Sequence, residues 1–66
     1  GYPPMTYLAR LRVQTACRRL YATTESVASI GAAVGFDDPY YFSRVFRRVM
    51  GVSPRAYRRS FAHDGQ

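Results

Sequence analysis

The sequence has no lysine, one histidine and one cysteine among its 66 residues. The lone cysteine, Cys17, cannot form a disulfide within the chain, which fits the reducing conditions of the cytoplasm. The lone histidine, His63, lies far from Cys17 in the C-terminal tail, so a zinc site of the usual Cys/His spacing is excluded. No run of about 18 apolar residues is present that could cross a membrane. We therefore expect one small domain with no metal, no cofactor and no membrane anchor.

Acidic residues are also scarce. Four acidic residues face ten basic ones, which gives a net charge of +6, and every basic residue is an arginine. An arginine guanidinium binds a phosphate or a guanine edge through two parallel hydrogen bonds, which a lysine ammonium cannot do. The surplus of positive charge suggests a polyanion such as nucleic acid as the partner. A basic surface that serves only solubility, or a GC-rich genome that encodes arginine in place of lysine, would produce the same balance.

The residue sets that enzymes need are missing as well. The sequence offers no paired acid and base, no cluster of metal ligands and no phosphate-binding glycine loop. Asp37 and Asp38 directly precede a proline and are expected to cap a helix, and Cys17 has no histidine or other base near it in the sequence. We therefore do not expect an enzyme. A cationic membrane peptide is also disfavoured, because glycine and proline divide the chain into several short segments.

The first predicted helix is long. From Met5 to Ala22 there is neither proline nor glycine, and apolar residues recur at helical spacing. Leu8 and Leu11 lie on a second ridge, about a quarter turn away from this stripe. A helix with two apolar surfaces is expected to pack against two different partners. The main stripe consists of Met5, Ala9, Val13, Ala16, Cys17 and Leu20.

A second, shorter helix is predicted over residues 27–34. Ser26 is a suitable N-cap for it. Gly31 lowers its stability by about 1 kcal/mol relative to alanine, so only burial can hold it in place. Gly35 supplies the left-handed residue that ends it. Its inward side chains are Val27, Ile30, Ala33 and Val34.

The third predicted helix covers residues 39–50, with Asp38 as its cap, Pro39 at its first position and Gly51 after its end. One face is an apolar stripe, with Tyr41 at its edge as a packing residue. The opposite face is polar and cationic. The apolar stripe contains Phe42, Val45, Phe46 and Val49, and the outer face contains Tyr40, Ser43, Arg44 and Arg47, with Arg48 on its flank.

A fourth helix is predicted over residues 54–59, with Ser53 as cap and Pro54 at its first position. Ala56 and Tyr57 are expected to pack inward, while the arginines at 55, 58 and 59 stay outside. The predicted fold is thus all-α, a single domain over residues 1–66 with about four helices. We divide it into a long helix at 4–22, a two-helix unit at 26–50, a C-terminal helix at 53–60 and a tail at 61–66.

A short helix, a turn containing glycine and a second helix with one apolar and one cationic face form a helix-turn-helix. A major groove about 12 Å wide admits one helix. Arg44 can then pair with a guanine, while Tyr40 and Ser43 contact bases or thymine methyl groups. Positions nearer the edge of the groove meet the DNA backbone, and an arginine-bearing face taken alone is also what an ordinary solvated helix shows. The expected backbone contacts are Arg47, Arg48 and the amides of Ser26 and Val27 at the start of the second helix.

The second half of the chain contains a series of short motifs at fixed spacing: Gly35-Phe36, Tyr41-Phe42-Ser43-Arg44, Phe46-Arg47, Gly51-Val52-Ser53-Pro54 and Tyr57-Arg58. This series resembles the C-terminal part of the DNA-binding region of the AraC/XylS family. Residues 4–20 are similar to the long helix that links the two helix-turn-helix units of that family. The resemblance covers residues 4–60 and implies a sequence-specific regulator, often an activator, of bacterial genes, acting at the nucleoid in the cytoplasm. It also implies Arg12 as a weaker phosphate contact.

The chain also departs from the family. The first helix-turn-helix is absent, and because position 1 is not a methionine we expect a fragment or a processed piece. Gly31 stands where alanine is usual, Ser29 where an acidic residue completes the cap, and Pro39 and Tyr40 where small polar residues are common. The ridge of Leu8 and Leu11 would have packed on the first unit, so its exposure predicts self-association. The alternative function is a protein-interaction module that docks RNA polymerase or a partner domain through the arginine face.

Overall fold

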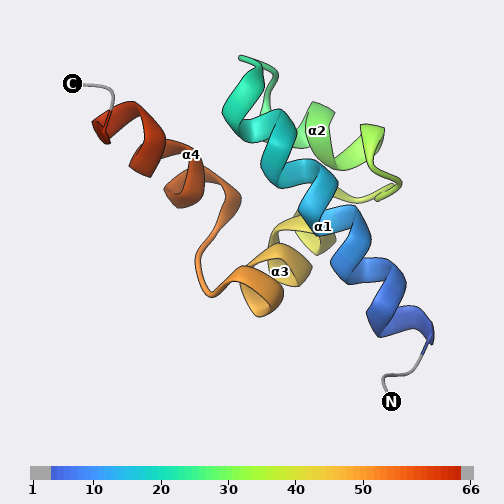
Figure 1. The fold of residues 1–66 in the computed structure, drawn as a ribbon. Helices are drawn as coiled ribbons and strands as arrows, with labels where there is room; N and C mark the ends of the chain where they lie inside the picture. Colours follow the sequence, from blue (N-terminus) through green and yellow to red (C-terminus); the bar gives the residue numbers. More distant parts are fainter. Residues whose placement is uncertain (1–3, 65–66) are drawn as a thin grey trace.

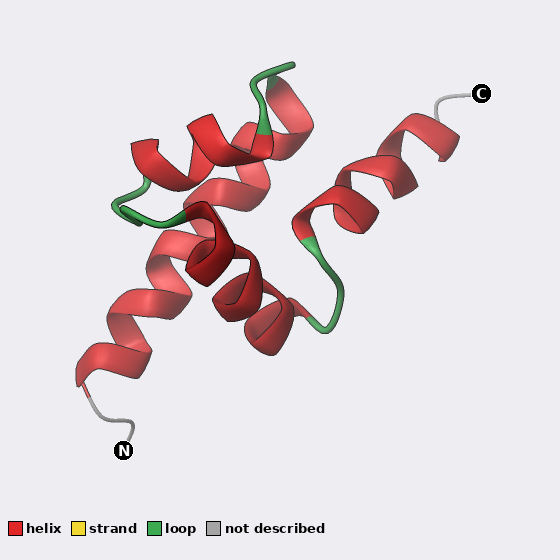
Figure 2. Cartoon of the chain, turned by 180° about the vertical axis from the view of Figure 1, so that it is seen from behind, coloured by secondary structure: helices red, strands yellow, loops and turns green. Residues whose placement is uncertain are grey.

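The computed structural model describes the backbone of residues 4–64 and the side chains of residues 7–60. Within this range the chain forms four helices and no strand, as predicted: α1 (Pro4–Ala22), α2 (Val27–Ala33), α3 (Pro39–Met50) and α4 (Pro54–Asp64). Helix α1 contacts all three other helices. Figure 1 shows α1 crossing in front of α2 and α3 with α4 to one side, and Figure 2 shows α2 and α3 from behind, in front of α1.

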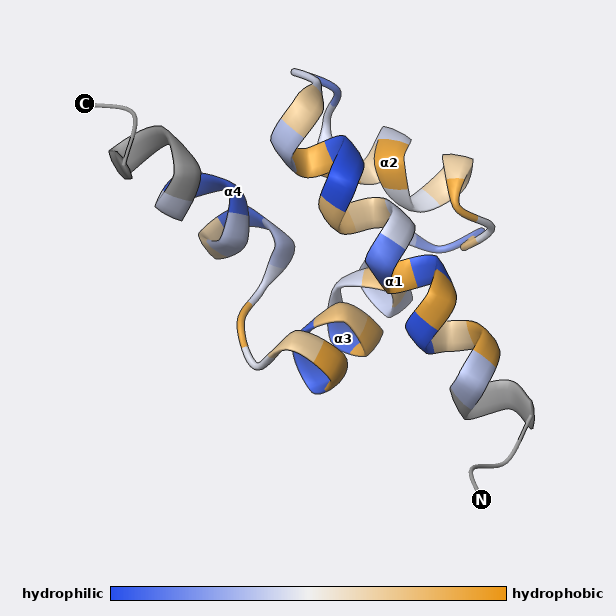
Figure 3. Cartoon of the chain, viewed as in Figure 1, coloured by the Kyte–Doolittle hydropathy of each residue, from blue (hydrophilic) through white to orange (hydrophobic). Residues whose placement is uncertain are grey.

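The predicted apolar stripes meet in one core, except that Ala33 of α2, which was expected in the inward set, is exposed. All four helices contribute to it, and Phe36 adds a side chain from the turn between α2 and α3. Along α1, hydrophobic and hydrophilic stretches alternate (Figure 3), as expected for a helix with one buried stripe. None of the described helices is long and apolar enough to cross a bilayer. The side chain of Met5, which was expected in the stripe, lies outside the described residues. The buried core consists of Val13, Ala16, Leu20, Ile30, Val34, Phe36, Phe42 and Phe46.

A row of aromatic rings runs through this core. The ring centroids are 5.3 Å apart between Phe36 and Phe42, 5.9 Å between Phe42 and Phe46, and 5.6 Å between Phe46 and Tyr57. The last two pairs meet edge to face, a favourable arrangement because the positive edge of one ring meets the negative face of the next. The row connects the α2–α3 turn, α3 and α4 into one packed unit.

The predicted caps are confirmed at three helix starts. The hydroxyl of Ser26 accepts the Ser29 amide at 3.0 Å, and that of Ser53 accepts the Ala56 amide at 3.1 Å. The carboxylate of Asp38 accepts the Tyr40 amide at 2.9 Å, with Pro39 at the first helical position. Each cap satisfies an amide that has no partner within its own helix.

The predicted glycine stops are also confirmed. Gly35 has φ +104° and Gly51 has φ +87°, both in the left-handed region. After α2, the amide of Gly35 donates to Ala32 O at 3.1 Å and that of Phe36 donates to Gly31 O at 2.8 Å. This pair of bonds is a Schellman motif, which closes the end of a helix and reverses the chain. The motif therefore fixes the short turn from α2 into α3.

The fourth helix differs from the prediction. It continues to Asp64, past Arg59 where we expected it to end, because residues 55–64 contain neither proline nor glycine. The expectation that Ala56 packs inward and Arg58 stays outside was wrong, since Ala56 is exposed and Arg58 is partly buried. The inward face holds Pro54, Tyr57 and Arg58, which follow the i, i+3, i+4 spacing of a single helix face.

Candidate nucleic-acid interface

Helix α3 has one buried and one open face. Phe42 and Phe46 are fully buried, whereas Tyr40 is 73% exposed. The guanidinium-bearing residues Arg44 and Arg47 are exposed as well, and Ser43 is half-buried. The structure thus brings the predicted outer-face residues of α3 together on the side away from the core. Arg48 is exposed on the flank of this face, as predicted.

The open face carries positive charge that is not paired with any acidic side chain of the described residues. Neither Arg44, Arg47 nor Arg48 has a hydrogen bond or an ion pair with any other described residue. A shallow hollow of about 250 Å³ is lined by Tyr41, Arg44, Val45 and Arg48. Three unpaired guanidinium groups on one helix attract anions, and their forked donors suit phosphate oxygens and guanine edges.

A close contact between α2 and α3 sets the position of this face. A Cβ atom added at Gly31 would lie 2.8 Å from Cδ2 and 2.9 Å from Cγ of Phe42, whose side chain is fully buried. Such distances are shorter than real Cβ contacts, so a larger residue would push the two helices apart. Gly31 weakens α2 as an isolated helix, but it allows α3 to approach α2 closely.

Arg12 holds the turn between α2 and α3. Its Nη1 donates to Gly35 O at 3.3 Å, and its Cζ lies 5.8 Å from the centroid of the Phe36 ring, within reach of a cation–π contact. The structure therefore places this predicted phosphate contact against the turn. Beside it, Tyr41 rests on Phe36 with 6.0 Å between ring centroids, yet remains 54% exposed, more open than a packing residue was expected to be.

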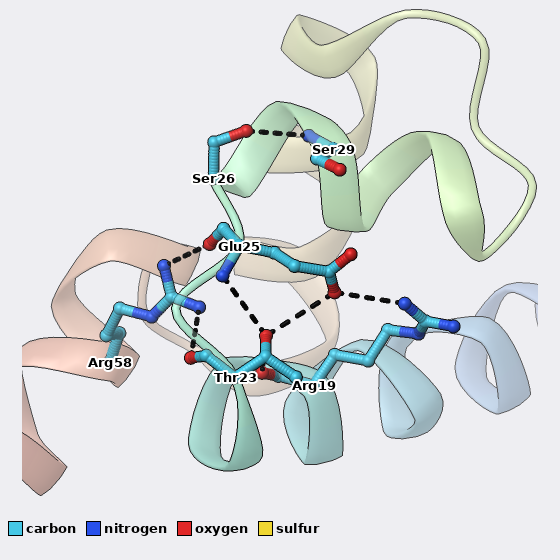
Figure 4. A network of polar contacts seen from close by, with 6 residues as sticks. All are labelled: Arg19, Thr23, Glu25, Ser26, Ser29 and Arg58. Atoms are coloured by element: carbon cyan, nitrogen blue, oxygen red, sulfur yellow. Dashed lines mark hydrogen bonds and ion pairs between the residues drawn. The ribbon is translucent and has the colours of Figure 1, made fainter.

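The start of α2 lies at the opposite end of this helix from the α2–α3 turn. Ser26 is exposed and Val27 is half-buried. The loop before them is held by Arg58, which was predicted to lie in solvent. Arg58 reaches from α4 to the backbone carbonyl of Leu20 near the end of α1 and to two carbonyls in the α1–α2 loop. Figure 4 shows the two loop contacts, to Thr23 and Glu25. Two sequence features could have indicated this inward position of Arg58. It follows Pro54 at i, i+4, on the same helix face, and no glycine follows α1 to close the end of that helix.

The thiol of Cys17 lies between α1 and α4. Burial raises the pKa of this thiol, and a hydrogen bond with Tyr57 opposes the rise only in part. Burial and the same hydrogen bond raise the pKa of the Tyr57 phenol. Both groups are therefore neutral near pH 7, and Cys17 packs against the core in agreement with the prediction. The side chain of His63 lies outside the described residues.

Comparison with known proteins also indicates a helix-turn-helix domain. Residues 1–60 match the family model described as a helix-turn-helix domain. The chain is 50% identical over 58 residues to the MmsAB operon regulatory protein of Pseudomonas aeruginosa, covering 88% of this chain and 19% of that protein. It is 44% identical over 55 residues to the HTH-type transcriptional activator RhaR of Pectobacterium carotovorum, covering 83% and 19%.

A third relative matches nearly the whole chain. The transcriptional activator NphR of a Rhodococcus species is 38% identical over 65 residues, which cover 98% of this chain and 19% of that protein. The chain spans about a fifth of the length of the curated relatives it matches. No solved structure matches the chain.

Proposed function

The chain belongs to the AraC/XylS family of bacterial transcription regulators as a helix-turn-helix DNA-binding domain, and we propose that α3 reads a specific sequence in the major groove of double-stranded DNA. The observation that carries this proposal is the open face of α3. It holds three guanidinium groups that have no partner among the described residues, on a helix whose opposite face is buried at Phe42 and Phe46. A helix about 10–12 Å across fits a major groove about 12 Å wide, so this face would meet the base edges.

Each residue of the face has a proposed role. Tyr40, Ser43 and Arg44 contact bases, with Arg44 donating to O6 and N7 of a guanine. Arg47 and Arg48 lie in the last turn of α3, where the helix leaves the groove, and bind phosphates. The amides of Ser26 and Val27 meet the backbone at the start of α2. Arg12 remains a weaker phosphate candidate, because one of its N–H groups is already bonded to Gly35.

The biological role follows from these contacts. Binding of one promoter sequence would place the parent protein at a gene and so regulate its transcription in the bacterial cytoplasm. Activation is the direction we propose, because several relatives carry the name of a transcriptional activator. The alternative role is docking of RNA polymerase through the same arginines, since an acidic protein surface can also pair with unpaired guanidinium groups.

The test begins with selection of a preferred duplex from a random library. Backbone amide signals of the free and DNA-bound chain are then compared by NMR. We expect the shifts to centre on residues 40–48. Shifts confined to other segments, or shifts that occur only with RNA polymerase, would favour the docking role.

The salt dependence of binding provides a second readout. If the chain neutralises about four to six phosphates, the slope of log K against log salt is near −4 to −5. Fluorescence anisotropy with the selected duplex at several salt concentrations measures this slope. A flat dependence, or no binding to any duplex at low salt, would refute DNA binding by this chain.

We also infer that the second ridge of α1 is a contact surface. Leu8 is 46% exposed and Leu11 is 41% exposed, and Tyr7 beside them is 60% exposed. Exposed apolar side chains of this size favour association, and a second copy of the chain is the partner to be tested. Sedimentation should show a dimer that dissociates in a Leu8→Ser and Leu11→Ser double variant. A monomer at all concentrations would refute self-association.

A further inference from the structure

Arg58 makes an unusual set of contacts for an arginine in a basic DNA-binding domain. Its Nε donates to Leu20 O at 3.2 Å, its Nη2 to Thr23 O at 3.1 Å and its Nη1 to Glu25 O at 2.5 Å. All three acceptors are backbone carbonyls, 33 to 38 residues earlier in the chain. The guanidinium is therefore directed into the protein.

These carbonyls need an external donor. The last four carbonyls of a helix have no partner within that helix, and Leu20 is among the last four residues of α1. Thr23 and Glu25 lie in the irregular loop between α1 and α2, where no regular structure supplies amides. A positive charge at the C-terminal end of a helix is also favourable, because the helix dipole is negative there. Arg58 thus serves as a cap for α1 that is delivered from α4.

The loop that Arg58 holds leads directly into α2. The carboxylate of Glu25 accepts from Arg19 Nη1 at 3.0 Å and from the Thr23 hydroxyl at 3.4 Å, while its amide donates to the Thr23 hydroxyl at 3.2 Å. Figure 4 shows Arg58 on one side of this loop and Arg19 on the other, with the Ser26–Ser29 cap of α2 just beyond. Glu25 is thus fixed through both its carbonyl and its carboxylate, one residue before the cap.

Helix α2 depends on such support. It has only seven residues and contains Gly31, so it cannot be stable by itself. Its orientation is set by its packing and by the loop before it. Since Phe42 of α3 packs directly on Gly31, a shift of α2 would also move α3 and its open face.

We propose that Arg58 is a positioning residue for DNA binding: it locks the α1–α2 loop so that α2 and α3 are held ready for the major groove. It does not contact the DNA. This inference rests on the proposed function. Holding a binding surface in its bound arrangement raises affinity because less conformational entropy is lost on binding. The planar fork is needed, because a lysine ammonium cannot span three carbonyls of fixed geometry.

The experiment compares three variants of the 66-residue chain with the wild type: Arg58→Lys, Arg58→Ala and the exposed neighbour Arg59→Ala as control. Affinity for the selected duplex is measured at several salt concentrations, at a temperature where each protein is folded by circular dichroism. We expect both Arg58 variants to bind about tenfold more weakly with an unchanged salt slope. Without DNA, their amide signals at residues 23–30 should shift, and those of Arg59→Ala should not.

Several outcomes would overturn the proposal. A salt slope smaller in magnitude by about 1 in Arg58→Ala, with the wild-type slope kept in the charge-preserving Arg58→Lys, would make Arg58 a phosphate contact. Altered amide signals with unchanged affinity would leave Arg58 with a structural role only. Should Arg58→Ala fail to fold, Arg58→Lys carries the same test, and full affinity in that variant refutes the need for the fork. Absence of wild-type binding to any duplex would refute the proposed function itself, which is a separate result.

Discussion

Six arginines of this small domain form two groups that differ in their partners. Arg12, Arg19 and Arg58 lie on α1 and α4, and each donates to a carbonyl or carboxylate of the same chain. Arg44, Arg47 and Arg48 lie on α3 and have no partner among the described residues. The side chain is the same in both groups, but the first uses its forked donors to hold loops together and the second leaves them open to an anion.

The difference indicates how a basic chain separates stability from binding. The inward group holds the two ends of α2: Arg58 secures the loop before it and Arg12 the turn after it. The outward group contributes little to folding, because like charges on an exposed helix gain nothing from one another. Loss of an inward arginine should therefore lower stability first, and loss of an outward one should lower only affinity.

Among the variants that test this comparison, Arg58→Ala should have the largest effect on stability. We expect the free energy of unfolding to fall by about 2–3 kcal/mol, because partly buried carbonyls lose hydrogen bonds from a charged donor. Urea denaturation followed by circular dichroism measures the change. Arg59→Ala, one residue further along α4, should stay within about 0.5 kcal/mol of wild type. Equal effects of the two variants would remove the distinction between the groups.

Arg44→Ala tests the outward group. Affinity for the selected duplex should fall by about 1–3 kcal/mol, with relaxed preference at one base position, because a bidentate guanine contact is lost. Stability should change by less than about 0.5 kcal/mol. Arg55→Ala removes the same charge from the exposed side of α4 and should weaken binding far less. If Arg44→Ala weakens all duplexes equally, Arg44 contacts a phosphate and not a base.

Gly31→Ala tests the contact that fixes α3. Helix propensity alone predicts a gain of about 1 kcal/mol, whereas overpacking against the buried Phe42 costs about 1–3 kcal/mol, so we expect a net loss of about 1 kcal/mol. The loss should shrink in a Phe42→Leu background, where the added methyl group meets a smaller side chain. Urea denaturation of the four proteins in this cycle gives the answer. A stabilised Gly31→Ala variant would show that α2 and α3 can separate freely.

Glu25→Gln is expected to have the smallest effect. It removes the 3.0 Å ion pair with Arg19, whose side chains are 42% and 35% exposed. Such an exposed pair contributes about 0.2–0.5 kcal/mol, and the contribution should decrease at high salt. Denaturation at low and high salt measures both values. A loss as large as that of Arg58→Ala would mean that the carboxylate, and not the Arg58 cap, holds the loop.

Much of the fold could be predicted from the sequence because it depends on neighbours in the chain. The caps at Ser26, Asp38 and Ser53 and the stop at Gly51 act over a few residues. The apolar stripes follow from helical periodicity, which also placed the arginines of α3 on its outer face. These features depend only on local spacing, so they can be recognised without knowing how the helices pack.

The tertiary structure decided which arginines face inward and why Gly31 is tolerated. The partners of Arg58 lie 33 to 38 residues away in the sequence, and the partner of Arg12 lies 23 residues away. Local sequence patterns therefore do not predict these contacts. Gly31 reads as a weak point in a helix until Phe42 is found against it. The sequence by itself determined the helices and the polar face of α3. The packing of the helices decided the roles of the inward arginines and of Gly31. The role of a hydrogen-bond donor or of a close contact depends on which groups lie next to it in space.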